Sequence, residues 1–183
     1  MDLYFKAEKG GLDFSYATSQ RQTLFNTDGI VGTALLADTL YARKIQVFAE
    51  YSFSNVFARV SSAAVGNGII GLYNLDANGL PNKLLATSVA LNTNVTSVQI
   101  LALDFPQTLK LGNYALVYNA SVNHSLNCSP AASVNPNWGY NGAILASGNL
   151  SVYTAAHVYT GSLPATFPAG TFATLNAPFI LTY

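Results

Sequence analysis

The chain has little charge, and the charge it has is unevenly distributed. Only 9% of its 183 residues are charged, against about 25% in an average soluble domain. Lys110 is the last charged residue, so the 73 residues that follow it (183 − 110) contain no Asp, Glu, Lys or Arg. Soluble surfaces normally carry charge. We therefore expect this uncharged third to be covered by partner subunits or to present a neutral polar face, with a merely polar, loop-rich surface as the alternative.

Other absences exclude whole classes of protein. Cys128 is the only cysteine, which excludes an intrachain disulfide and any multi-cysteine metal site. No uninterrupted apolar run approaches the roughly 20 residues of a membrane helix, and no secretory signal is visible. Eight basic residues are balanced by eight acidic ones, and only Arg43 and Lys44 are adjacent. Because phosphate binding relies on clustered basic residues, we expect no nucleic acid as partner. Because no apolar run is long enough to form a membrane helix, we also expect no membrane as partner.

The segments that are present are typical of β-strands. Short apolar or alternating runs recur at intervals of roughly ten residues, separated by Gly, Pro, Asn and Asp. The strands expected from this pattern are 34–40, 45–49, 53–61, 69–73, 83–89, 97–105, 114–118, 143–145, 150–153 and 179–183. The only short-helix candidate is 34–40, because no longer segment combines a capping residue with a 3.6-residue apolar repeat. An antiparallel sandwich or barrel is predicted.

We expect one domain of this kind, preceded by an extended segment. Residues 1–32 show no sustained period and are interpreted as an N-terminal arm or docking segment, and residues 33–183 as the β-sandwich domain. Within that domain residues 114–118 are apolar at every position but carry two tyrosines, which predicts a strand between two packed layers. Residues 121–142 are interpreted as a long excursion of functional or interfacial type.

The stretch from Asp76 to Pro81 is predicted to be a turn. Asp and Asn side chains bond to nearby backbone, Gly79 permits positive φ, and Pro81 fixes φ. A helix–loop–helix calcium site is not expected, because the twelfth position of the loop counted from Asn74 is Leu85 instead of Glu and no flanking helices are predicted.

No catalytic constellation is expected either. Glycoside hydrolysis needs two carboxylates facing each other, and the eight acidic residues all precede residue 105, at predicted strand ends, in turns or in the arm. His124 and Cys128 lie four residues apart without a nucleophile-elbow pattern, so Cys128 is expected to be buried or interfacial. We therefore expect a non-enzymatic protein with no catalytic residue, metal or cofactor.

Six short segments, taken in order, resemble a known module. They are Tyr41, Phe53–Val56, Ile70–Tyr73, Asp76–Pro81, Leu84–Ala86 and Leu111–Leu116. Their order and spacing resemble a β-sandwich module of tailed-phage virion structural proteins, in which a "GIY" strand, a "DxNGLP" loop, an "LL" strand and an "LxxGxYxL" strand recur. The resemblance covers about residues 35–120, and departs from the pattern at Leu72, where Ile is usual, and at Asn113, where a small residue is usual.

The resemblance implies an all-β, antiparallel, jelly-roll-like β-sandwich and a function in the virion. The expected protein is a homotrimer that decorates the capsid or forms a short head fibre, with the major capsid protein among its partners, assembled in the bacterial cytoplasm. The alternative is a tail-fibre or baseplate protein that recognises host surface glycans.

Two sets of residues are candidates for contact with a partner. Aromatic platforms and amide side chains bind sugars without charge, and the excursion offers such groups for a glycan or a protein partner. They are His124, Asn137, Trp138, Tyr140 and Asn141. Trp138 closing one end of the sandwich is the alternative. In the uncharged third, Tyr153 and Tyr159 are candidates for a subunit interface, because aromatic residues are frequent anchors of such contacts.

Overall fold

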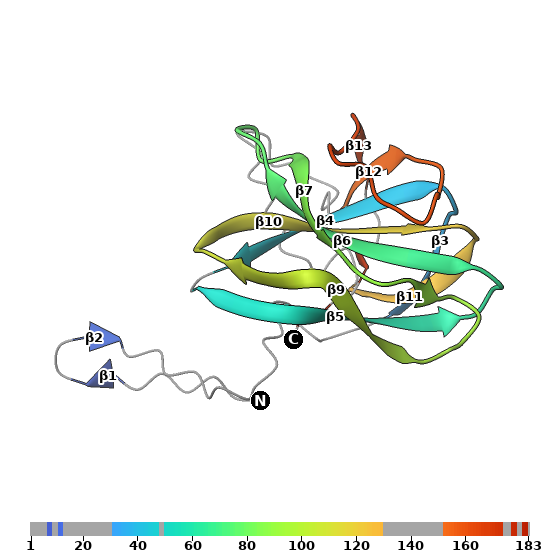
Figure 1. Ribbon diagram of the computed structural model, residues 1–183, viewed down its shortest axis with the longest axis horizontal. Helices are drawn as coiled ribbons and strands as arrows, with labels where there is room; N and C mark the ends of the chain where they lie inside the picture. Colours follow the sequence, from blue (N-terminus) through green and yellow to red (C-terminus); the bar gives the residue numbers. More distant parts are fainter. Residues whose placement is uncertain are drawn as a thin grey trace.

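The structure, a computed structural model, describes residues 7–8, 11–12, 31–47, 50–129, 152–173, 177–178 and 181–182. In these residues all regular secondary structure is β-strand and every strand pairing is antiparallel. Two sheets pack against each other, as Figure 1 shows. The prediction of an all-β sandwich is confirmed.

Nine strands form the sandwich. They are β3 (Val31–Leu35), β4 (Thr39–Val47), β5 (Tyr51–Ser62), β6 (Asn67–Leu75), β7 (Pro81–Thr87), β8 (Leu91–Asn92), β9 (Val98–Leu109), β10 (Gly112–Ala120) and β11 (His124–Ser129). The first sheet has the order β4-β10-β6-β7, with β8 also on β6. In the second sheet β3 pairs with β11, β11 with β5, and β5 with β9.

This pairing is that of a jelly roll. Counting β7 and β8 as one strand gives eight, which pair first with eighth, second with seventh, third with sixth and fourth with fifth. The pairs alternate between the two sheets. Leu35 of β3, for example, lies opposite His124 of β11.

The two sheets are joined along one side. Ser88, which follows β7, forms a bridge with Leu103 of β9, and the Val89 N–H donates to the carbonyl of Ala102 at 2.8 Å. Beyond this point the Gln99 side chain bonds in both directions to the backbone of Asn92 in β8. An unpaired strand edge is a template for aggregation. This seam covers part of the edge of both sheets.

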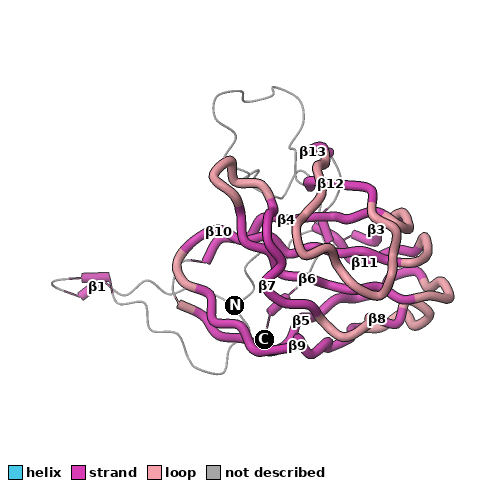
Figure 2. Tube along the Cα trace, turned by 45° about the horizontal axis from the view of Figure 1, so that its top comes forward, coloured by secondary structure: helices cyan, strands magenta, loops and turns pink. Residues whose placement is uncertain are grey.

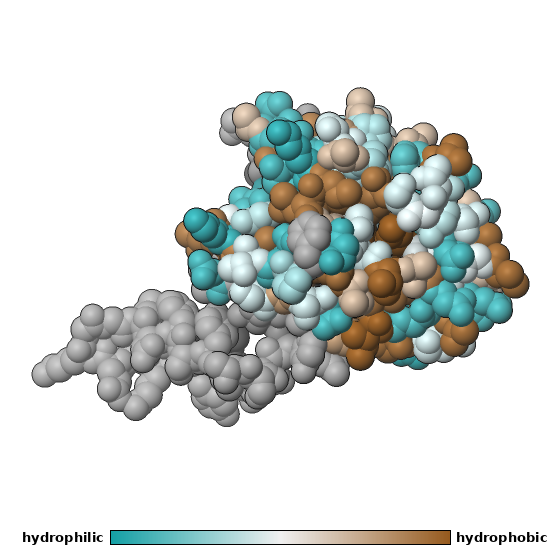
Figure 3. Space-filling model, in the orientation of Figure 1, coloured by the Kyte–Doolittle hydropathy of each residue, from teal (hydrophilic) through white to brown (hydrophobic). Residues whose placement is uncertain are grey.

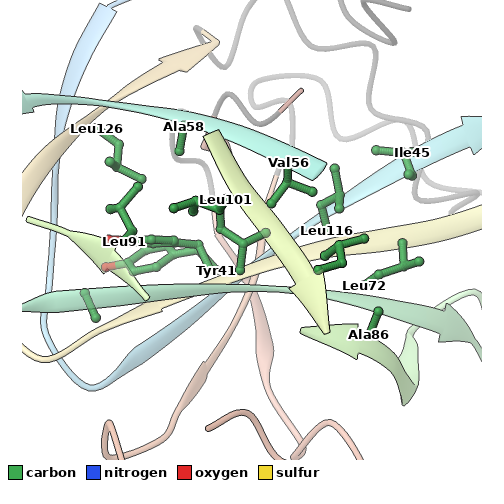
Figure 4. Close-up of a cluster of buried hydrophobic side chains, with 14 of the residues drawn as sticks. Tyr41, Ile45, Val56, Ala58, Leu72, Ala86, Leu91, Leu101, Leu116 and Leu126 are labelled. Atoms are coloured by element: carbon green, nitrogen blue, oxygen red, sulfur yellow. The ribbon is translucent and has the colours of Figure 1, made fainter. Parts of the chain in front are cut away.

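The main core lies between the sheets. Leu72 and Leu116 of the first sheet meet Val56, Leu101 and Leu126 of the second, all at most 3% exposed. Figure 4 shows these side chains converging from the two layers. In β10 alternate residues point to opposite sides: the residues from Ala115 to Ala120 are all buried, which confirms the prediction of a strand between two layers.

A second core lies on the outer side of the first sheet. There residues 152–173, with β12 (Val152–Ala156) and β13 (Thr171–Ala173), extend the sheet beside β4 and cover its face (Figure 2). Tyr73 and Val117 of the sheet are buried beneath Leu163 and Phe167 of this covering segment. Gly71 lies directly beneath the Leu163 side chain, which a methyl group at this position would displace.

Hydrogen bonds hold the covering segment in place. The Tyr73 hydroxyl donates to the Pro164 carbonyl at 2.6 Å, and the Phe167 N–H donates to the Asn82 carbonyl at 2.7 Å. At the other end the Tyr159 N–H donates to the Asp38 carboxylate at 2.7 Å. The uncharged sequence is here a third layer of the same chain.

Two local predictions need correction. The segment 34–40, expected as one strand with a short helix as the alternative, is the end of β3, a turn and the start of β4, because Asp38 takes a positive φ of 55° that reverses the chain. The supposed excursion begins with β11, in which His124, Leu126 and Cys128 point inward and alternate with less buried residues. The pattern has the period of a strand, but a histidine and a cysteine in place of aliphatic residues concealed it.

The remaining short strands are β1 (Ala7–Glu8), β2 (Gly11–Leu12), β14 (Ala177–Pro178) and β15 (Leu181–Thr182). β1 pairs with β2, β14 with β11 and β15 with β5. β3 begins at Val31, close to the predicted boundary of the sandwich domain at residue 33. The N-terminal arm at 1–32 stays a prediction, since most of it lies outside the described residues.

Candidate functional site

Most of the candidate glycan-binding group lies outside the described residues. This applies to Asn137, Trp138, Tyr140 and Asn141. His124 is the one member that the structure describes, and it is 6% exposed. It therefore does not present its ring to a ligand on the surface.

His124 and Tyr118 form a buried polar pair. The Nδ1 of His124 lies 3.0 Å from the Val122 carbonyl, which can only accept, so Nδ1 carries a proton. In the neutral ring Nε2 is then an acceptor, and the Tyr118 hydroxyl donates to it at 2.7 Å. Both ring nitrogens are satisfied within the chain, which gives the pair a structural role.

Burial determines the ionisation of this pair. Desolvation lowers the pKa of His124, and the bond to the Val122 carbonyl opposes this only in part. Desolvation also raises the pKa of Tyr118 far above its usual value. Both groups are therefore neutral at pH 7, and their hydrogen bond is one between uncharged partners.

The two tyrosines expected at a subunit interface belong to the chain's own outer core. Tyr153 is 7% exposed and packs on Phe172, with ring centroids 4.9 Å apart. Its hydroxyl accepts a hydrogen bond from Gly170 N–H at 3.0 Å. Tyr159 is partly buried against the same cluster. Both aromatic rings thus pack within the chain. A role at a subunit interface would have to rely on the part of the Tyr159 side chain that stays exposed.

The Asp76 loop is the turn that the sequence predicts. The Asp76 Oδ1 accepts from the N–H groups of Asn78 at 2.8 Å and Leu80 at 2.9 Å, and Gly79 takes a φ of 77°. The backbone closes the turn, since Asp76 N–H donates to the Leu80 carbonyl at 2.8 Å. The side chain is used to fix the loop that joins β6 to β7.

Other carboxylates have the same use. Asp38 accepts from Tyr159 N–H, and Asp104 accepts from both the N–H and the hydroxyl of Thr87 at 3.1 Å. Each joins two segments that are distant in sequence. Among the residues that the structure describes, no group of three His, Cys, Asp or Glu could hold a metal ion.

The adjacent basic residues Arg43 and Lys44 are more buried than the residues of a basic binding patch would be. Arg43 is 5% exposed, and burial lowers its pKa to about 10. Lys44 is partly buried, and desolvation lowers its pKa. Cys128 is fully buried, in agreement with the prediction.

An apolar surface on β9 was not anticipated from the sequence. Val98 and Ile100 are 60% and 62% exposed, although the strand also points Leu101 and Leu103 into the core. A signal was present, because a strand that is apolar at both alternating sets of positions buries only one set in a sheet with one covered face. What was lacking was the knowledge that the outer face of β9 is left uncovered.

The described residues contain no helix that is both long and apolar enough to cross a membrane. No family model, curated protein or solved structure matches this chain.

Proposed function

We propose that this chain is a non-enzymatic structural protein of a tailed-phage virion, an oligomer, specifically a trimer, that decorates the capsid or forms a short head fibre. The observation that carries the proposal is the position, in the fold, of the six segments that resemble the virion module. Four of the strands that contain them, β4, β10, β6 and β7, are consecutive neighbours in the first sheet. Leu116 pairs directly with Leu72, and the Asp76 loop joins two of these strands.

The chemistry of the segments supports a structural function. Many of their residues are core or turn residues, such as Leu72, Tyr73 and Asp76. Three of the carboxylates in the described part of the chain, those of Asp38, Asp76 and Asp104, accept backbone N–H groups of the same chain. Their use in joining segments favours a scaffold over an acid–base catalyst.

Immuno-electron microscopy of purified virions, with antibody against the full chain, tests the proposal. Label on the head, together with peptides of the chain in the mass spectrum of purified particles, is the expected result. Absence of the chain from purified particles would overturn it. Label on the tail tip would favour the alternative, an adsorption protein that recognises host surface glycans. Its main candidates, Asn137, Trp138, Tyr140 and Asn141, can be tested by glycan-array binding of the wild-type chain and a Trp138→Ala variant.

A further inference from the structure

The outer face of β9 carries a continuous apolar stripe. Of the eight large hydrophobic residues that the described chain exposes, four lie between residues 89 and 100. Figure 3 shows hydrophobic residues in separate patches among hydrophilic ones on one side of the molecule. Single exposed hydrophobic residues are ordinary, but an aligned group marks a contact surface.

The geometry of the strand aligns these residues. Successive side chains of a strand point to opposite faces, so Val98, Ile100, Ala102 and Asp104 point outward while Leu101 and Leu103 are buried. The seam places Val89, which is 53% exposed, directly beside Ala102. The pairing of β9 with β5 is regular from residue 98 to residue 102, a length of about 14 Å at about 3.4 Å per residue, and it shifts register beyond Ala102.

One charge of each sign lies at the ends of this stripe. Arg59 of β5 is exposed and pairs with Val98, so it shares that face of the sheet. Asp104 lies at the opposite end, held at the seam by Thr87. The side chains of β9 between these ends are uncharged.

This arrangement is complementary to itself under a two-fold rotation. Leu101 lies midway between residues 98 and 104. A two-fold axis that passes beside Leu101 therefore stacks the stripes of two copies face to face, with their strands running in opposite directions. Arg59 then faces Asp104 of the partner subunit, and the large Ile100 faces the small Ala102 of the partner subunit. A two-fold interface requires such pairing of residue i with j and of j with i.

We propose that the outer face of β9, with Val89 and Arg59, is an isologous contact between two copies of this chain. The bulk of the contact is formed by Val98, Ile100 and Val89, and the flanking charges fix the direction of pairing. The inference goes beyond the proposed function, because it names a surface and a symmetry that do not depend on where the protein is used. In a trimeric protein this contact joins chains of neighbouring trimers.

Sedimentation equilibrium of the purified full chain tests the contact. The wild-type chain is expected to form an even-numbered assembly whose mass falls to half on dilution. Ile100→Asp is expected to give the half-mass species at all concentrations, with an unchanged circular dichroism spectrum, since this side chain is largely exposed. Val65→Asp, at a residue 81% exposed in the connection between β5 and β6, is the matched control and should keep the wild-type mass.

Disulfide trapping provides a readout that does not depend on the stability of a charged variant. A mixture of Ile100→Cys chains with Ala102→Cys chains should form the crosslinked pair on mild oxidation, in higher yield than either variant alone. The native Cys128 is buried and does not compete. A wild-type chain that is monomeric or purely trimeric, an Ile100→Asp mass equal to that of the wild type, or equal trapping in all samples would overturn the inference. None of these results decides whether the chain is present in purified particles, which the virion test measures separately, although a monomeric chain would also contradict the proposed trimer.

Discussion

At the scale of single residues, buried polar groups connect stability to pH. His124 is held neutral between the Val122 carbonyl and the Tyr118 hydroxyl, and burial lowers its pKa in the folded chain. The unfolded chain takes up a proton near the usual pKa of about 6.5. Protons therefore bind the unfolded state more readily, and the free energy of unfolding must decrease as pH falls below this value.

We expect urea midpoints to fall between pH 7 and pH 5 in the wild-type chain, and to fall much less in a His124→Gln variant. The glutamine side chain can donate or accept a hydrogen bond but cannot titrate, so the difference between the two curves reports this residue alone. If the variant is destabilised at pH 7 yet keeps the wild-type pH dependence, His124 is not the source of the effect.

The Asp76 carboxylate makes a second prediction at this scale. Asp76→Ala leaves the N–H groups of Asn78 and Leu80 without their side-chain acceptor. We expect a loss of about 1–2 kcal/mol in the free energy of unfolding, the usual effect of removing such a local acceptor. Asn78→Ala is the control, because the Asn78 side chain is exposed and lies 3.5 Å from Asp76. Equal losses in the two variants would show that Asp76 is not the residue that fixes the loop.

At the scale of elements, the covering segment determines what Tyr153 does. Tyr153→Asp puts a charge beneath this segment, between Phe167 and Phe172, and burial of an unpaired charge costs several kcal/mol. We expect this variant to detach residues 152–173 from the first sheet and to increase amide exchange in them and in β4. Tyr153→Phe keeps the ring and loses the bond that the hydroxyl accepts from Gly170 N–H, for which about 1 kcal/mol is expected.

A Tyr153→Asp variant that keeps wild-type exchange but loses assembly would restore the sequence-based view of Tyr153 as an interface residue. Hydrogen–deuterium exchange and sedimentation on the same samples separate the two outcomes.

The sequence predicted the elements of the sandwich better than its third layer. The strand that contains Tyr118 and the Asp76 loop were identified because each is fixed by local rules, the alternation of a strand and the chemistry of a turn. β11 was missed because its inward positions are His124 and Cys128, whose burial depends on long-range partners. The role of Tyr153 could not be predicted for a similar reason. The lack of charge after Lys110 indicates that these residues are buried, but it does not tell whether the same chain or a partner subunit buries them.

At the scale of the whole molecule, the pairing of strands sets the speed of folding. The jelly roll pairs its first strand with its last, and Leu35 meets His124 across 89 positions (124 − 35). Folds dominated by such distant contacts fold slowly, commonly in milliseconds to seconds.

We expect refolding from urea, followed by the fluorescence of the tyrosines and Trp138, to fall at the slow end of that range or beyond it. A Leu126→Ala variant should slow refolding only if β11 pairs in the transition state, and otherwise should mainly accelerate unfolding. Completion in microseconds would contradict the expectation.

The pairing of β3 with β11 also decides how the protein responds to force. Val31 lies opposite Cys128, so the chain enters and leaves the jelly roll at adjacent points. Tension applied through positions 31 and 129 opens this strand pair like a zipper, with the load on one hydrogen bond at a time. Tension through positions 65 and 110 instead acts near the starts of the antiparallel strands β6 and β10, whose register runs from Tyr114 opposite Asn74 to Ala120 opposite Gly68. There all the bonds of the pair share the load in shear.

Optical-trap measurements with cysteine handles at each pair of positions should therefore give a lower rupture force for 31 and 129 than for 65 and 110. Equal forces would mean that another strand pair resists first. A domain gripped at positions 31 and 129 would thus behave as a mechanical fuse, which peels from its first strand, while the same domain gripped by its loops would resist the load.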